Sequence, residues 1–217
     1  MNNQEIINKT ISFVKNTLKE ADGSHDWWHI YRVWKNTLLI LKTEKANYLT
    51  CELAALLHDI ADHKFHNGNE TIGAKKAEEF LISLNIDKEI INDVVKIVEN
   101  ISFLGGHKKS NYYSIELAVV QDADRLDAIG AIGIARTFAY GGYKKREIYN
   151  PKIKPNLQMS KEEYKNSTAP TINHFYEKLL LLKDKMNTET GKKLAYERHS
   201  FMEQFLEQFY NEWEGKL

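Results

Sequence analysis

The chain has 217 residues, and its 30 basic and 30 acidic side chains give a formal net charge of zero at pH 7. This balance gives no sign of a nucleic-acid binder, so the expected partner is a small molecule. The single cysteine, Cys51, excludes an internal disulfide and suits a reducing compartment. No apolar stretch reaches the roughly 20 residues of a membrane span, and the N-terminus lacks an apolar signal region. We therefore expect a cytoplasmic protein that does not contact a membrane.

The apolar residues recur at spacings of three and four rather than alternating, which predicts helices in nearly every segment. Asp26 is the expected N-cap of the second helix, and Asn69 and Asp87 open the fourth and fifth. The third helix is apolar nearly all round at its centre, so it should be buried. The first five helices are expected over about 7–18, 27–41, 49–61, 71–84 and 88–101.

A loop at 105–109 separates these helices from a long, largely apolar helix over about 114–140. Gly130 and Gly133 lie on one side of it and let a neighbouring helix approach closely. The helical spacing of apolar residues stops between about 141 and 170, a segment that holds all three prolines and several basic residues. Such a segment is typical of a functional lid or of disorder. The last two helices run from Phe175 to Met186 and from Leu194 to Trp213, with 188–191 between them.

These elements predict an all-α fold, a helical bundle that forms a single domain over residues 1–217. Within it we expect a core at about 22–140, a basic lid-like loop at about 141–170 and C-terminal helices at 171–217.

Four ionisable residues end the third predicted helix: His58, Asp59, Asp62 and His63. Burying such groups unpaired is unfavourable, so they need partners, a metal or solvent at the helix end. Adjacent helical residues project about 100 degrees apart, which lets His58 and Asp59 reach one ion from neighbouring directions. Asp62 returns to the same side and stays available for proton transfer. On spacing alone, a solvated Asp62 at the helix end is an equally good interpretation.

A His-Asp pair is a weak signal by itself, because the chain contains a second one at His25-Asp26. An N-cap role explains Asp26, and His25 is interpreted as a structural residue beside it. His29 lies one turn further into the same helix. It is either a hydrogen-bonded core histidine or the imidazole that a second helix must offer to complete a metal site.

Asp124 supplies a third element, because it projects from an apolar helical stripe and needs a positive partner. A structural ion pair and metal ligation are both open for this carboxylate. The nearby Asp122 can pair with Arg125 at a spacing of three, and Asp127 fits an interhelical hydrogen bond.

Together, these residues resemble the H…HD…D signature of the HD-domain metal-dependent phosphohydrolases. The resemblance covers about residues 22–140 and is strongest to the stand-alone bacterial branch of the YedJ and YpgQ type. It implies an all-α HD-domain bundle that holds one divalent metal through His29, His58, Asp59 and Asp124. It also favours a catalytic, proton-transferring role for Asp62. Two imidazoles and two carboxylates suit Mn²⁺, with Mg²⁺, Co²⁺, Ni²⁺ or Fe²⁺ as alternatives.

The expected substrate is a phosphorylated small molecule, and the resemblance favours a nucleotide. We expect nucleoside or deoxynucleoside triphosphates to be cut to monophosphate and pyrophosphate, because a basic loop suits a polyphosphate. The alternatives are a 5'-nucleotidase, a cyclic-nucleotide or phosphodiester hydrolase with a second metal, and a non-catalytic nucleotide-sensing protein. His63 and His107 are the histidines that a second metal could recruit. The expected substrate-binding residues are Arg32, Lys64, His66, Lys144, Lys145 and Arg146.

Aromatic residues gather in two places. Trp27, Trp28, Tyr31 and Trp34 are either a base-stacking platform or core, and their helical spacing favours core. The aromatic final helix, which ends at Trp213, offers a surface for a homodimer.

Overall fold

The computed structural model describes residues 1–19, 26–60, 72–101 and 112–216. Every regular element in these ranges is a helix and none is a strand, which confirms the all-α prediction. No helix in the same ranges is long and apolar enough to cross a membrane. The chain divides into two compact units, Met1–Asp124 and Arg125–Leu217. The expected single domain over 1–217 stays a prediction.

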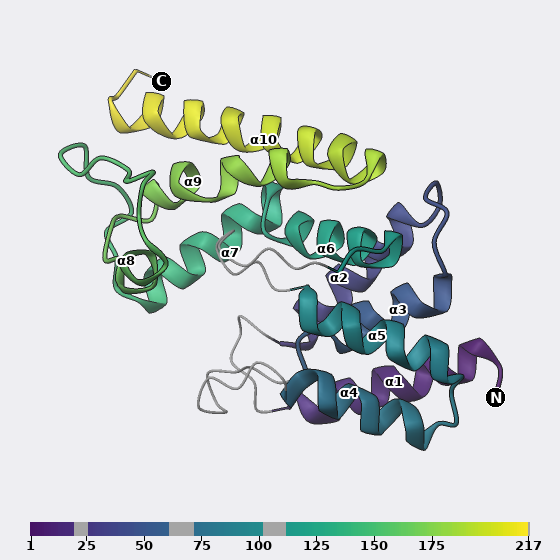
Figure 1. Cartoon of the computed structure of the whole chain (residues 1–217). Helices are drawn as coiled ribbons and strands as arrows, with labels where there is room; N and C mark the ends of the chain where they lie inside the picture. The colour runs from purple at the N-terminus through teal and green to yellow at the C-terminus, as the bar shows by residue number, and fades with distance from the viewer. Residues whose placement is uncertain (20–25, 61–71, 102–111, 217) are drawn as a thin grey trace. The chain divides into compact units, whose positions relative to one another are not determined.

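The first unit is built from helices whose bounds follow the predicted ones closely, except at the end of the third (Figure 1). Local capping explains several of their starts: Asp26 and Asp87 each accept a backbone N–H from the first turn of their helix, as predicted. Asn69, the expected opening residue of the fourth helix, lies outside the described residues. The helices are α1 Asn3–Thr17, α2 Trp27–Ile40, α3 Tyr48–Leu57, α4 Ile72–Ser83 and α5 Lys88–Asn100, followed by α6 Ile115–Asp127, whose last residues belong to the second unit.

The buried α3 helix is the centre of the first unit. Its residues 53–57 are all fully buried, and α1, α2 and α5 pack around it, which confirms the predicted burial. The predicted end at residue 61 is wrong, because α3 ends at Leu57 and His58 is its C-cap. The His58 ring bonds to the Ala55 carbonyl through Nδ1 at 2.9 Å, and so satisfies one of the carbonyls that a helix end exposes.

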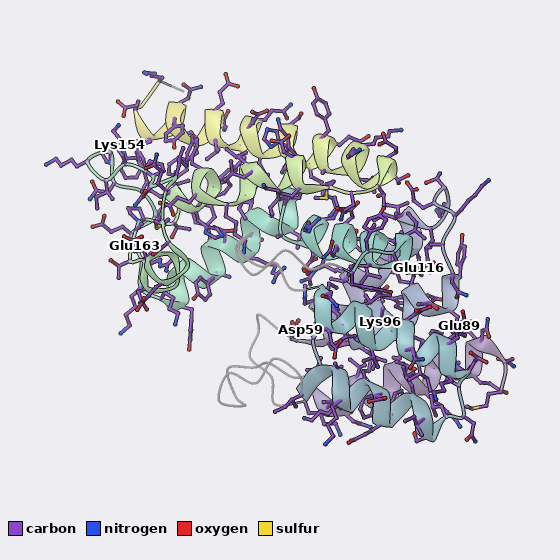
Figure 2. All side chains as sticks on the ribbon, viewed as in Figure 1. Asp59, Glu89, Lys96, Glu116, Lys154 and Glu163 are labelled. Atoms are coloured by element: carbon purple, nitrogen blue, oxygen red, sulfur yellow. The ribbon has the colours of Figure 1, made fainter. Side chains whose placement is uncertain are left out.

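The buried face of α5 follows from the spacing of its apolar residues. Its buried residues Ile91, Val94 and Ile97 recur at a spacing of three, whereas Glu89 and Lys96 lie on the exposed side (Figure 2). The preceding turn reverses the chain through Asn85, which has a φ of 53°. Asparagine tolerates this left-handed conformation better than most residues. The turn lets α4 and α5 pack against each other as a pair.

The second unit assembles around the long C-terminal helix. An aromatic core joins its elements: the ring centroids of Phe138 and Phe205 are 5.9 Å apart, and Phe175 stacks on Phe205 at 5.8 Å. Because such pairs bury large apolar areas, they fix the packing of α7 and α9 on α10. The elements are α7 Gly130–Tyr143, α8 Lys161–Asn166, α9 Asn173–Glu177, the 3₁₀ helix η2 Leu179–Lys185 and α10 Glu189–Trp213.

The single helix predicted over 114–140 is wrong, because α6 and α7 are separate helices. The break falls at Gly130, whose φ of +74° is left-handed and incompatible with a continuing right-handed helix. A Cβ added to Gly130 would lie 3.0 Å from Cβ and Cγ of Arg198 on α10, so the predicted close approach of a neighbouring helix is confirmed at this glycine. Across the break, Arg136 donates to the buried Asp127 carboxylate at 2.5 Å, which confirms the interhelical bond expected of Asp127.

Two further boundaries differ from prediction. The helix expected from Phe175 to Met186 is split into α9 and η2 by Lys178, whose φ of −144° and ψ of −58° interrupt the helix. Helix α10 begins at Glu189 with Thr188 as N-cap, so Gly191 lies inside it rather than in a separating loop. The segment expected to lack structure contains α8, and its role as a lid stays a prediction.

Candidate metal centre

His29 is placed by the capped start of α2. The Asp26 carboxylate accepts a hydrogen bond from the His29 backbone N–H at 2.9 Å, which fixes the first turn of the helix. Because α2 packs against α3, this face of the turn is buried, and His29 is only 5% exposed. The imidazole is therefore held close to the end of α3 rather than in solvent.

His58 and Asp59 follow directly after the last residue of α3. The Ala55 carbonyl can only accept, so the 2.9 Å contact assigns the proton of the neutral His58 ring to Nδ1. The lone pair then resides on Nε2, the nitrogen that faces Asp124 at 4.0 Å. An imidazole oriented through its other nitrogen by a backbone carbonyl is the usual arrangement of a metal-ligating histidine.

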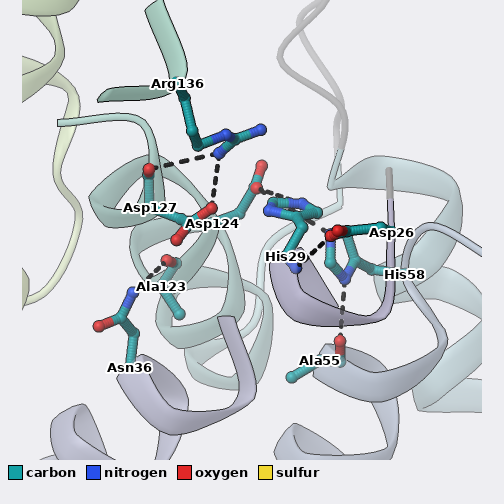
Figure 3. A network of polar contacts seen from close by, with 9 residues as sticks. All are labelled: Asp26, His29, Asn36, Ala55, His58, Ala123, Asp124, Asp127 and Arg136. Carbon is teal, nitrogen blue, oxygen red and sulfur yellow. Dashed lines mark hydrogen bonds and ion pairs between the residues drawn. The ribbon is translucent and has the colours of Figure 1, made fainter. Parts of the chain in front are cut away.

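Asp124 comes to the same place from α6. Its Oδ1 atom is 3.5 Å from Nε2 of His29 and 4.0 Å from Nε2 of His58 (Figure 3). The two imidazole rings lie edge to face with their centroids 5.3 Å apart. The Asp124 side chain is 32% exposed, so the centre lies at an accessible edge rather than in a sealed core.

Asp59 completes the group. His29, His58 and Asp59 each offer one ligand atom, and these atoms all lie within 4.8 Å of one another. The structure thus groups three of the four nominated residues, and the fourth, Asp124, lies close to the two imidazoles. With neutral imidazoles, the set carries two negative charges and none of the opposite sign, so a cation fits its charge as well as its donor atoms.

The other predicted site residues are less well placed. Arg32 lies partly exposed on α2, three residues after His29. Lys144 and Lys145 are exposed in the second unit, where the Lys144 ammonium lies 5.3 Å from the Tyr143 ring centroid. Arg146 is partly buried and donates to the Ser167 carbonyl. The other residues named for catalysis, substrate binding or a second metal lie outside the described residues; they are Asp62, His63, Lys64, His66 and His107. His25 also lies outside them.

The core interpretation of the α2 aromatic residues is wrong for Trp28. Trp28 is 60% exposed, and Trp27, Tyr31 and Trp34 are only partly buried. They form a ladder of ring contacts along the outside of the helix, with ring centroids 5.9 to 6.2 Å apart. The helical spacing that suggested core also produces a continuous stripe on a partly exposed face.

Two supporting groups escaped the sequence analysis. One is the Ala55 carbonyl, which carries no sequence signal at all. The other is Asn36, whose amide donates to the Ala123 carbonyl at 3.1 Å. The sequence feature that could have identified Asn36 is its position, seven residues after His29 on a face that is otherwise largely apolar.

Comparison with known proteins gives these residues a context. A model of the HD domain family matches residues 27–129. A crystal structure described as an HD-superfamily hydrolase from Bacillus thuringiensis is 46% identical, with a TM-score of 0.80, and covers 98% of this chain and 99% of its own. Protein YpgQ of Bacillus subtilis is 37% identical over 91% of this chain and 88% of its own. A structure of YpgQ in complex with ADP matches with a TM-score of 0.78, covering 98% of this chain and 97% of its own.

Proposed function

The chain belongs to the HD-domain superfamily of metal-dependent phosphohydrolases, and we propose that its substrates are nucleoside or deoxynucleoside triphosphates. As a member it is a hydrolase that uses a divalent metal. The observation that carries the proposal is the convergence of His29, His58 and Asp59 on one point, with Asp124 beside both imidazoles. The choice of a nucleotide is supported by the ADP complex of the relative YpgQ.

The proposed metal ligands are His29, His58, Asp59 and Asp124, and the preferred ion is one Mn²⁺. Two nitrogen and two carboxylate donors have mixed hardness, which suits Mn²⁺ while leaving Mg²⁺, Co²⁺, Ni²⁺ and Fe²⁺ as alternatives. When bound, such an ion supplies Lewis-acid chemistry: it polarises a phosphoryl oxygen and makes a water molecule more acidic.

The remaining work falls to the side chains around the ligands. Asp62, three residues after Asp59, is proposed to accept a proton from the attacking water or to deliver one to the leaving oxygen. Arg32 is proposed to bind a phosphate oxygen, because a guanidinium can hold phosphate through two parallel hydrogen bonds. Lys64, His66, Lys144 and Lys145 are proposed to contribute further positive charge toward the phosphate chain.

In the proposed reaction, water adds to the α-phosphorus as the bond to the bridging oxygen breaks. The products are a nucleoside monophosphate and pyrophosphate, with the proton of the water released or passed to the leaving group. A carboxylate near the reacting phosphate fits this step, since it can hold the proton between attack and departure.

The test is a substrate screen with product identification. The purified chain is incubated with Mn²⁺ and a panel of nucleoside triphosphates, deoxynucleoside triphosphates, monophosphates and cyclic nucleotides, and the products are identified by anion exchange and phosphorus NMR. We expect monophosphate and pyrophosphate in equal amounts, and none from Asp59→Asn. Orthophosphate released from monophosphates would show a nucleotidase instead. A chain that binds Mn²⁺ and nucleotide without turnover would show a sensing protein.

A further inference from the structure

Asn36 lies on the same face of α2 as His29, two turns further along the helix. A spacing of seven residues returns a side chain to nearly the same side of an α-helix. Asn36 is only 9% exposed, and Ile30, Val33 and Ile40 nearby in the helix are fully buried. A buried amide in such surroundings is unfavourable unless it forms hydrogen bonds, so its position calls for an explanation.

The Asn36 amide reaches the helix that carries Asp124. Its Nδ2 atom donates to the Ala123 backbone carbonyl at 3.1 Å, and Ala123 directly precedes Asp124 (Figure 3). Helix α2 therefore meets one turn of α6 twice, because His29 also lies 3.5 Å from the Asp124 carboxylate. The two contacts differ in kind: the Asn36 bond holds main chain, whereas the His29 contact joins two side chains that can rotate.

We propose that Asn36 is a positioning residue, which fixes where α6 presents Asp124 to His29 and His58. This inference rests on the proposed metal centre. A shift of α6 by one residue along its axis moves its side chains by about 1.5 Å, whereas metal–ligand distances tolerate only about 0.2 Å. Loss of the Asn36 bond should therefore weaken metal binding more than it weakens folding.

The test compares two Asn36 variants with the wild type, using Mn²⁺ alone as the probe. Asn36→Leu replaces the amide by an apolar group with the same branching, and Asn36→Ala removes the amide without adding volume. Mn²⁺ affinity is measured from the electron paramagnetic resonance signal of the free ion, and folding from the melting temperature of the metal-free protein. We expect affinity to fall about 10- to 100-fold, with the melting temperature of a folded variant within about 5 °C of the wild type.

The chain offers a matched control in the next residue of α2. Thr37 is fully buried, and within the described part of the chain its hydroxyl has no hydrogen-bond partner. Thr37→Val therefore removes a buried hydroxyl from the same helix without breaking a hydrogen bond to α6, and its Mn²⁺ affinity should equal that of the wild type.

The outcomes separate the two levels of the proposal. Normal Mn²⁺ affinity in whichever Asn36 variant folds would overturn the positioning role while leaving the metal centre intact. An equal loss of affinity in Thr37→Val would also overturn it, because the effect would then be general to α2. A wild-type protein that binds no Mn²⁺ would overturn the metal centre, and this inference with it.

Discussion

The Asp124 carboxylate faces two imidazoles, a geometry that either an ion pair or a metal could explain. The Nδ1–H group of His58 donates to the Ala55 carbonyl, so in the neutral ring the Nε2 lone pair faces Asp124. A lone pair and a carboxylate oxygen do not attract each other. A cation between them removes this conflict and uses both as ligands.

Replacing Asp124 tests this interpretation. Asp124→Asn keeps the shape of the side chain but removes a negative donor, so we expect Mn²⁺ affinity to fall by at least about a hundredfold. Isothermal titration with Mn²⁺ measures the change. Asp87→Asn is the matched control, because Asp87 is an N-cap of α5 and asparagine caps a helix about equally well. Unchanged affinity in Asp124→Asn would show that this carboxylate is a structural partner of the histidines.

The buried His174 of the second unit makes the free energy of unfolding depend on pH. Burial, followed by the nearby charges of Lys178 and Arg146, lowers the pKa of His174 from 6.5 to about 3. Between these two values the unfolded chain binds a proton that the folded chain does not. The contribution of His174 to the free energy of unfolding is therefore fully present above pH 6.5 and is lost as pH falls toward 3. The slope is at most about 1.4 kcal/mol per pH unit.

We predict that the difference in unfolding free energy between the wild type and His174→Gln depends on pH. From pH 7 to pH 5 the wild type should lose up to about 2 kcal/mol more unfolding free energy than the variant. Urea unfolding at each pH measures this. Between pH 7 and pH 8 the difference between the two proteins should stay constant, which provides the internal control. If both proteins lost unfolding free energy in parallel below pH 6, His174 would be protonated as readily in the folded state as in the unfolded one.

At the scale of elements, the turn between α6 and α7 depends on Gly130. Its φ of +74° is unfavourable for any residue with a Cβ, and an added Cβ would also lie 3.0 Å from the Arg198 side chain. We therefore expect Gly130→Ala to lower the free energy of unfolding by about 1 to 3 kcal/mol. Chemical denaturation measures the effect.

Gly142 provides the control for this substitution. It lies in α7, and a Cβ added there meets nothing within 4 Å. Gly142→Ala should therefore stabilise the protein by about 0.5 to 1 kcal/mol, because alanine favours the helix. If Gly130→Ala were also neutral or stabilising, the left-handed turn would not be required for the break between the helices.

The elements show where sequence reasoning succeeds and where it stops. The starts of α2 and α5 were predictable because their caps, Asp26 and Asp87, act on backbone a few residues away. The break at Gly130 was not, because the apolar period continues across it and a left-handed glycine looks the same in sequence as a packing glycine. At the end of α3 the His58 ring bonds to the Ala55 carbonyl, a contact that periodicity cannot register.

The site follows the same division. His29, His58, Asp59 and Asp124 could be named from residue type, spacing and resemblance. The structure groups the first three and brings Asp124 close to both imidazoles. Asn36 could not, because a helical pattern reveals which residues share a face but not what lies opposite them. The contact with the Ala123 carbonyl depends on how α2 meets α6, which only tertiary structure provides.

At the scale of the whole molecule, all four proposed ligands lie in Met1–Asp124, and none lies in Arg125–Leu217. A metal that binds only the folded state stabilises it by about 2.7 kcal/mol when its concentration is 100 times its dissociation constant. If the units open independently, Mn²⁺ stabilises only the unit that contains its ligands. If they unfold together, as a single domain over 1–217 would, the stabilisation reaches both.

Hydrogen exchange on the full chain distinguishes these cases. We expect saturating Mn²⁺ to slow exchange in α2, α3 and α6 by about a hundredfold, since 2.7 kcal/mol corresponds to that factor. The amides of α10 report on the second unit, because that helix carries much of its core. Equal protection in α10 would support one cooperative domain, and unchanged exchange there would show two independently opening units. Asp124→Asn is the control: its exchange should not respond to Mn²⁺, since protection then depends on a ligand that is absent. Protection that persists in this variant would place the ion elsewhere.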